Sequence, residues 1–132
     1  MMIDRLIPLL NVESVIRSIA FYRDHLGFEV LHEWEDGGRV RWAWLEHGGV
    51  KLMLNEPDEA PSRARRKRGP YSDAVFYFHV PDVDALHERL KAADLALGEL
   101  KDESYGFREF YLRDPDGYEL GFGTPIENVT PI

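Results

Sequence analysis

Apolar and polar residues follow one another in a repeating order along the first half of the chain. An apolar run at 3–12 is followed by apolar residues at helical spacing, namely Val15, Ile19, Tyr22 and Leu26. Three alternating runs then follow at 28–34, 39–46 and 50–55. Spacings of three and four indicate one helical face, and alternation indicates half-buried strands. With Gly27 as a helix stop, this half predicts one strand, one helix and three further strands.

The second half repeats the same order. A strand is expected at 74–80, a weaker strand at 97–104 and a closing hairpin at 105–122. Between them lies a helix with the apolar stripe Val83, Leu86, Leu90 and Ala93. Residues 12–15 (Val-Glu-Ser-Val) match residues 80–83 (Val-Pro-Asp-Val) at a spacing of 68. The chain is therefore interpreted as an α+β fold of two βαβββ modules, at 3–55 and 74–123, joined by a linker at 56–73.

The closing hairpin has the clearest register. Asp114-Pro115-Asp116-Gly117 has the composition of a bulged three-residue loop, because proline fixes φ and Gly117 can adopt a positive φ. The pairs predicted across that loop are Arg113 with Glu119, Leu112 with Leu120, Tyr111 with Gly121 and Phe110 with Phe122. This register pairs opposite charges and gathers the apolar residues on one face, which is expected to be core. Tyr111 and Gly121 remain on the other face.

The faces opposite the expected core are candidate binding surfaces. In the first module, pairing of His47 with Val50 and Leu45 with Leu52 places two tryptophans on the same face as Lys51. A mostly aromatic surface with a few polar groups is typical of a small-molecule site. The candidate ligand-binding residues are Trp42, Trp44, Met53, Asn55, Tyr77, His79, Phe107, Glu109, Tyr111 and Glu119. An open alternative is that the tryptophans pack against another subunit, since aromatic residues are common in both settings.

Composition narrows the functional classes. The net charge of -8 disfavours a nucleic-acid partner, and the basic residues at 63–68 have no interleaved aromatic residues. The absence of cysteine excludes disulfides, thiolate metal sites and a cysteine nucleophile. We find no apolar run of membrane-spanning length and no secretory pattern, so a cytoplasmic location is expected. The role of the basic run is left open.

At this point the sequence resembles the vicinal-oxygen-chelate superfamily, which includes glyoxalase I, fosfomycin-resistance proteins, extradiol dioxygenases and bleomycin-resistance proteins. The duplicated modules cover nearly the whole chain. The specific segments are 18–28 (Ser-Ile-Ala-Phe-Tyr-Arg-Asp-His-Leu-Gly-Phe), Arg-Glu-Phe at 108–110 and Arg-Asp-Pro-Asp-Gly at 113–117. Pro-Leu-Leu at 8–10 is similar to the bleomycin-resistance branch, where a proline in the first strand marks a segment exchanged between subunits. The resemblance therefore implies a strand-exchanged homodimer.

Metal-dependent members of this superfamily carry a His, Gln or Glu ligand on each of four strands. Matching the motifs places those positions here at Ile7, Lys51, Val75 and Gly121. None of these supplies an imidazole or carboxylate donor for a divalent ion. We therefore expect no metal ion and no other cofactor, and the resemblance is nearest to the metal-free bleomycin-resistance branch.

Three functions stay open on the sequence. The leading one is a non-catalytic protein that binds an antibiotic-type small molecule, aromatic and cationic, as a homodimer without nucleic-acid or membrane partners. The second is a glyoxalase-like lyase or isomerase, in which His79 with Glu109 or Glu119 is the candidate acid–base pair. The third is an interaction module whose aromatic face is only a dimer seam.

Overall fold

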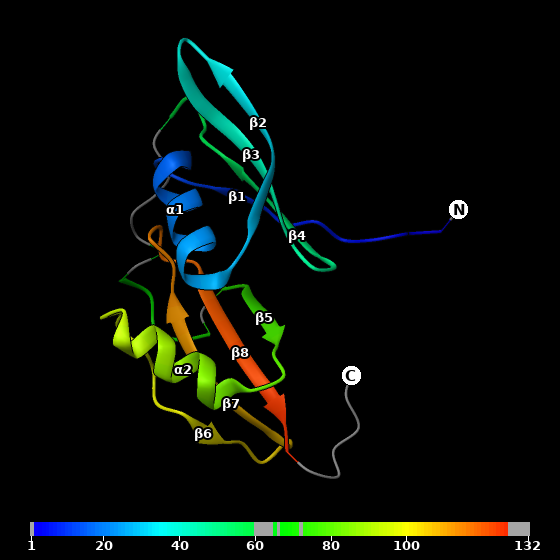
Figure 1. Ribbon diagram of the computed structural model, residues 1–132, viewed down its shortest axis with the longest axis vertical. Coiled ribbons are helices and arrows are strands. Elements are labelled where there is room, and N and C mark those ends of the chain that lie inside the picture. The colour runs from blue at the N-terminus through cyan, green and yellow to red at the C-terminus, as the bar shows by residue number, and fades with distance from the viewer. Residues whose placement is uncertain (1, 60–64, 66, 72, 127–132) are drawn as a thin grey trace. The chain divides into compact units, whose positions relative to one another are not determined.

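The computed structural model describes residues 2–59, 65, 67–71 and 73–126, and the chain divides into two compact units. The first unit is Met1–Arg63 and the second is Ala64–Ile132. Each holds one four-stranded sheet with one helix, in the same element order, as Figure 1 shows. The α+β fold of two βαβββ modules is thus confirmed. Part of the predicted linker, including Arg63 and Arg66, lies outside the described residues.

The first unit contains the elements β1 (Leu9–Asn11), α1 (Val15–Leu26), β2 (Glu29–Asp36), β3 (Arg39–His47) and β4 (Val50–Asn55). The strand order in its sheet is β1-β4-β3-β2, with β1 parallel to β4 and the other pairs antiparallel. The helix packs its predicted stripe on the sheet, because Val15, Ile19 and Tyr22 are all buried. Ala43 and Leu45 of β3 are buried as well, so the core lies between α1 and the sheet.

The ends of α1 follow from local sequence. The Ser14 side chain accepts a hydrogen bond from the Arg17 backbone N–H at 3.2 Å, which satisfies one of the free donors at the helix start. Gly27 ends the helix in the left-handed region with φ 75°, where its N–H donates to the Arg23 carbonyl. The predicted helix and its glycine stop are both confirmed.

The second unit contains the elements β5 (Val75–His79), α2 (Val83–Ala92), β6 (Lys101–Asp102), β7 (Phe107–Arg113) and β8 (Glu119–Pro125). Its strand order is β5-β8-β7-β6, which repeats the order of the first unit. The Asp82 carboxylate caps α2 by accepting from the Ala85 N–H at 3.1 Å. On the core side, the Phe110 and Phe122 rings stack with centroids 5.3 Å apart.

The β7–β8 hairpin has the predicted register. Arg113 lies opposite Glu119 and Tyr111 opposite Gly121. The loop is the predicted three-residue bulge: Gly117 has φ 86° and donates its N–H to the Asp114 carbonyl at 2.9 Å, while the Asp114 N–H donates to Tyr118 at 2.9 Å. The four predicted core residues of the hairpin, Phe110, Leu112, Leu120 and Phe122, are all buried.

Four details differ from the sequence prediction. The first strand is only Leu9–Asn11, because Pro8 has no N–H to give and enters the ladder only as an acceptor, at 2.8 Å from the Met53 N–H. The expected strand at 97–104 is reduced to β6, Lys101–Asp102. Ala93 is exposed because it caps the C-terminus of α2. The residues of β5 expected in the core, Phe76 and Phe78, are only half-buried.

Among the described residues no helix is long and apolar enough to span a bilayer.

Candidate functional site

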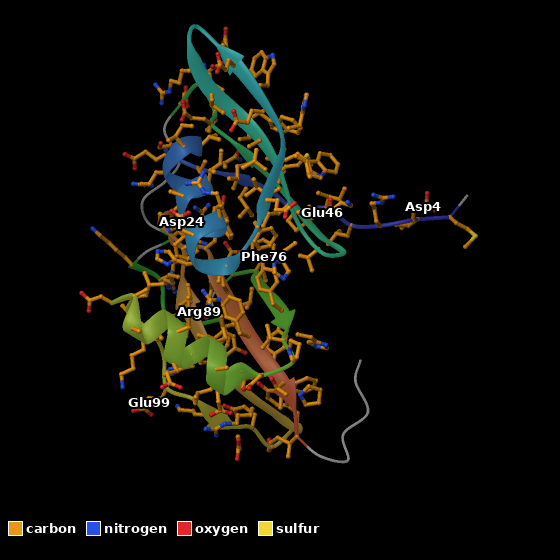
Figure 2. All side chains as sticks on the ribbon, in the orientation of Figure 1. Asp4, Asp24, Glu46, Phe76, Arg89 and Glu99 are labelled. Atoms are coloured by element: carbon orange, nitrogen blue, oxygen red, sulfur yellow. The ribbon has the colours of Figure 1, made fainter. Side chains whose placement is uncertain are left out.

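The face of the first sheet that points away from α1 carries the predicted tryptophans. The β3–β4 register sets Trp42 beside Asn55 and Trp44 beside Met53, so these four residues share one face, as predicted. The two indole rings lie 6.2 Å apart at an interplanar angle of 66°. Toward the hairpin end, Glu46 (Figure 2) forms an ion pair with Lys51 at 3.2 Å.

Strand β2 adds aromatic residues to this face that the sequence analysis did not assign to it. His32 pairs with Trp44 and Trp34 pairs with Trp42 in the β2–β3 ladder. The His32 ring lies 5.9 Å from that of Trp42, and Trp34 is 55% exposed. Extending the predicted hairpin register to β2 could have found both, but bulges at Val30–His32 and Trp34–Glu35 shift the alternation.

The corresponding face of the second sheet carries tyrosines over glycines. Tyr77, Gly121 and Tyr111 form one row across β5, β8 and β7. A Cβ atom at Gly121 would meet Tyr111 Cε1 at 2.6 Å and Tyr77 Cδ2 at 2.8 Å. A Cβ at Gly123 would meet the Tyr77 hydroxyl at 1.9 Å. The two tyrosine rings therefore occupy the space that side chains on β8 would otherwise take.

Beneath these rings lies a buried carboxylate. Glu109 on β7 is only 1% exposed. Its Oε1 atom accepts a hydrogen bond from the Tyr77 hydroxyl at 2.8 Å. Its Oε2 atom is buried and has no hydrogen-bond partner among the residues that the structure describes. A buried carboxylate that lacks partners is costly, so an oxygen left in this state points to a role that the fold alone does not explain.

Three tyrosine hydroxyls respond to this carboxylate. Burial, followed by the hydrogen bond to Glu109, raises the pKa of Tyr77 well above its ordinary value. Burial and the Glu109 carboxylate likewise raise the pKa of Tyr111. The same two causes raise the pKa of Tyr105 to about 12. All three therefore stay protonated and neutral at physiological pH, and each keeps a hydroxyl proton to donate. We call Tyr77, Tyr105 and Tyr111 around Glu109 the tyrosine cluster.

Exposed aromatic residues lie beside this cluster. The Tyr105 ring, on the turn before β7, is 57% exposed and lies 6.3 Å from that of Phe107. The Tyr71 ring is 62% exposed and meets Tyr111 edge-on at 5.3 Å. Neither tyrosine was among the predicted site residues. Tyr105 continues the alternation of Phe107, Glu109 and Tyr111 and could have been found by it, whereas nothing in the sequence around Tyr71 indicates its position.

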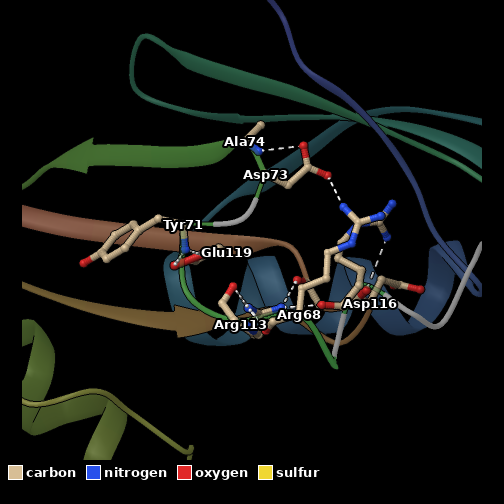
Figure 3. A network of polar contacts seen from close by, with 10 residues as sticks. Arg68, Tyr71, Asp73, Ala74, Arg113, Asp116 and Glu119 are labelled. Atoms are coloured by element: carbon tan, nitrogen blue, oxygen red, sulfur yellow. Dashed lines mark hydrogen bonds and ion pairs between the residues drawn. The ribbon is translucent and has the colours of Figure 1, made fainter.

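Glu119 lies at one end of the same face, where a loop packs against the hairpin. The Tyr71 backbone N–H donates to both Glu119 carboxylate oxygens, at 3.1 and 3.3 Å (Figure 3). The neighbouring Arg113 guanidinium donates to the carbonyls of Arg65, Arg68, Gly69 and Gly117. Arg68 in turn pairs with Asp73 at 2.6 Å. The Glu119 carboxylate thus holds the backbone of Tyr71, whose ring contacts Tyr111 of the tyrosine cluster.

His79 and Phe107 complete the predicted residues of the second unit. Their rings lie 5.2 Å apart, and Phe107 packs edge-on against Tyr77 at 6.0 Å. His79 is exposed and lies in the same row of the sheet as Glu109, with Gly123 between them. The group that bonds to Glu109 is Tyr77 and not His79, so the second-unit site is a carboxylate among phenols with an imidazole beside it.

The four residues that the sequence resemblance matches to metal-ligand positions do not have the chemistry to hold a metal ion. Ile7 and Val75 are aliphatic, Lys51 is a cation paired with Glu46, and Gly121 has no side chain. The space over Gly121 is filled by the Tyr77 and Tyr111 rings. Within the described ranges, no three His, Cys, Asp or Glu side chains gather in a way that could hold an ion. The arrangement instead offers aromatic faces and the buried carboxylate of Glu109.

Comparison with known proteins places these features in a family. The family model described as Glyoxalase/Bleomycin resistance protein/Dioxygenase superfamily matches residues 3–122. A bleomycin resistance protein from Geobacillus stearothermophilus is 29% identical over 133 residues, covering 92% of this chain and 97% of that protein. Metallothiol transferase FosB from Staphylococcus haemolyticus is 30% identical over 115 residues, covering 86% of this chain and 78% of that protein. The crystal structure of SMU.1112c superposes with a TM-score of 0.74 at 26% identity, covering 92% of this chain and 99% of that one.

Proposed function

The chain belongs to the Glyoxalase/Bleomycin resistance protein/Dioxygenase superfamily, and from that premise we propose that it is a non-catalytic binding protein for an aromatic, antibiotic-type small molecule. One observation carries the proposal: both sheets present an aromatic face opposite their helix, while the family's metal-ligand positions lack donors. The bleomycin resistance protein from Geobacillus stearothermophilus, similar over 97% of its length, supports the same type of function.

The first-unit face provides the stacking surface. Trp42 and Trp44 are half-buried, so each is held by its neighbours and still exposes part of its indole. Rings held in this way lose little conformational freedom when a planar heterocycle stacks on them. Asn55 lies beside Trp42, and its amide donates to the Asn11 side chain at 3.1 Å, which fixes a polar group at the edge of the aromatic surface. This combination suits a planar ligand with polar substituents.

The proposal is tested by titrating metal-free bleomycin while following tryptophan fluorescence. We expect quenching in the parent protein. Trp42→Ala, Trp44→Ala and Tyr111→Ala should each weaken binding by on the order of 1 kcal/mol or more while the protein stays folded. Ile16→Ala is the matched control, since Ile16 is an exposed apolar residue on α1.

Two results would contradict this proposal. One is the absence of saturable quenching in the parent. The other is a loss of roughly 3–5 kcal/mol of unfolding free energy in the alanine variants, which is typical of packed core aromatics. Urea melts of the same four variants separate the two effects, because a binding residue changes affinity at nearly unchanged stability.

A glyoxalase-like lyase or isomerase is the second candidate, and one observation favours it. Glu109 is a buried carboxylate hydrogen-bonded to the Tyr77 hydroxyl, and such a pair has the chemistry of a proton acceptor with a positioned donor. The similar metallothiol transferase FosB is an enzyme by name. Turnover of the glutathione–methylglyoxal adduct by the parent, lost in Glu109→Gln, would favour this function over binding alone.

A further inference from the structure

The buried Glu109 carboxylate is the least explained group in the described part of the chain. It is 1% exposed, and only one of its two oxygens is hydrogen-bonded. A glutamine would fill the same volume and could still accept from Tyr77 without a buried charge. Structural need alone therefore does not account for a carboxylate at this position.

The shell around the unpartnered oxygen is aromatic. The Phe107 ring lies 6.0 Å from that of Tyr77, which in turn lies 6.3 Å from that of Tyr111. The faces of such rings are electron-rich and attract cations within about 6 Å. No arginine or lysine pairs with Glu109 among the described residues. The described part of the chain thus supplies a carboxylate and aromatic faces here, without an arginine or lysine paired to them.

From this geometry we propose that Glu109 and the tyrosine cluster form a cation subsite, in which the free carboxylate oxygen receives a protonated amine of the ligand and the phenol rings enclose it. The inference deepens the proposed function and rests on it for the role of the ligand. An ammonium group suits the site because it donates one strong hydrogen bond to Oε2 and presents its remaining charge to the rings.

The subsite opens through its exposed ring. Tyr105 is 57% exposed, and its hydroxyl is close enough to Glu109 for the carboxylate to help raise its pKa. Rotation of an exposed tyrosine about χ1 is a nanosecond event that disrupts no strand. A ligand amine can therefore replace Tyr105 at the mouth of the subsite while Tyr77 keeps its hydrogen bond to Oε1. Because the hydroxyls of the tyrosine cluster are neutral, the ligand supplies the positive charge in this subsite.

The test compares 2-phenylethylammonium with its neutral isostere 2-phenylethanol. The protein's aromatic-ring NMR resonances are followed during each titration. The cation should shift the rings of Tyr77, Tyr105 and Tyr111 and bind roughly tenfold more tightly than the alcohol, as expected of one charge-assisted hydrogen bond. In Glu109→Gln this preference should vanish, and the denaturation midpoint should stay unchanged or rise because a buried charge is gone.

Glu88→Gln is the matched control, because it removes one carboxylate from the exposed surface of α2 in the same unit. It should retain the preference for the cation. Equal binding of the two probes, a preference that survives Glu109→Gln, or shifts confined to the Trp42 and Trp44 rings would overturn the inference. The last outcome is measured in the parent protein and does not depend on the folding of any variant.

The bleomycin titration separates this inference from the proposed function. If the ammonium probe binds at Glu109 but bleomycin does not quench, the subsite stands and the antibiotic-type ligand is wrong. If bleomycin binds equally well to the parent and to Glu109→Gln, and the ammonium probe shows no preference, the proposed function stands and the cation subsite is wrong.

Discussion

Gly123 shows how a single missing side chain sets the chemistry of the second sheet. The Tyr77 ring crosses over this residue to reach Glu109, and its hydroxyl lies 1.9 Å from where a Cβ of residue 123 would be. The next ring atom, Cζ, is itself only 2.7 Å away, so the contact can be relieved only if the whole Tyr77 ring moves. Glycine at 123 is therefore a requirement of the Tyr77–Glu109 hydrogen bond.

We predict that Gly123→Ala destabilises the protein by about 1–3 kcal/mol, the usual cost of overpacking. The Tyr77 ring must rotate away, which leaves Glu109 with no hydrogen-bonded oxygen. Urea melts measure the loss, and the Tyr77 ring resonances report the displacement. Gly49→Ala is the control, since a Cβ there meets nothing within 4 Å. Equal stability of the two variants would contradict the prediction.

At the scale of elements, one arginine joins a loop to the β7–β8 hairpin. The Arg113 guanidinium donates to Arg65 at 2.6 Å and to Arg68 at 2.9 Å, both through backbone carbonyls. Glu119 on the opposite strand holds the Tyr71 N–H. These bonds keep Tyr71 against Tyr111, so the hairpin positions an aromatic ring beside the tyrosine cluster through the residues that precede β5.

We predict that Arg113→Ala releases this loop. Loss of its charged hydrogen bonds to the loop carbonyls, each worth about 1.5–3 kcal/mol, should increase cleavage by trypsin after Lys67 or Arg68 roughly tenfold or more. Arg113→Lys should behave similarly, because an ammonium cannot span several carbonyls as a guanidinium does. Limited proteolysis followed by mass spectrometry measures the effect.

Arg108→Ala is the matched control for that experiment. Arg108 lies on the same strand but pairs with the exposed carboxylates of Asp84 and Asp102, each at 3.0 Å. Exposed pairs of this kind contribute little to stability. Cleavage in Arg113→Ala no faster than in Arg108→Ala would show that the loop is held by other contacts.

The hairpins were predictable from sequence because their two faces differ in kind. In the β7–β8 hairpin, apolar Leu112 and Leu120 alternate with the charged pair Arg113 and Glu119, so a shift by one residue would bury charges. The pattern could also group the candidate residues by face. It could not show that Glu109 is buried, because that depends on Tyr77, which lies 32 residues away.

The weaker predictions concerned segments whose partners are not local. Strand β6 is short because only Lys101 and Asp102 pair with β7, although Gly98 still donates to Tyr111 at 2.8 Å. The position of Tyr71 depends on a φ of 61° and on contacts with Glu119, neither of which leaves a periodic signal. Alternation reports the face of a strand and says nothing about which loop packs on that face.

At the scale of the whole molecule, the first-unit sheet exposes large apolar side chains on its face away from α1. Trp34 is 55% exposed and Leu9 is 47% exposed on the face that also carries Trp42 and Met53. Contiguous aromatic surface of this kind is typical of an interface. Residues 8–10 (Pro-Leu-Leu) also resemble the segment that subunits exchange in the bleomycin-resistance branch, which likewise leads us to expect a dimer.

We predict a homodimer at micromolar concentration. Light scattering should give twice the 15.3 kDa mass of one chain. Trp34→Glu should shift the equilibrium toward monomer, because a charge at an apolar interface is costly. Ile16→Glu, an equally exposed position on α1, should not. A parent protein of 15.3 kDa under these conditions would remove the dimer and any binding groove shared between subunits.

The tyrosine rings over β8 also limit how this chain could change over generations. A carboxylate side chain at Gly121, which the family resemblance matches to a metal-ligand position, would bring its Cβ to 2.6 Å from Tyr111 and 2.8 Å from Tyr77. Tyr77 and Tyr111 would both have to be replaced by smaller residues before that side chain could fit. Loss of the two rings would in turn expose Glu109. A carboxylate at Gly121 would therefore come at the cost of the packing that the Tyr77 and Tyr111 rings provide.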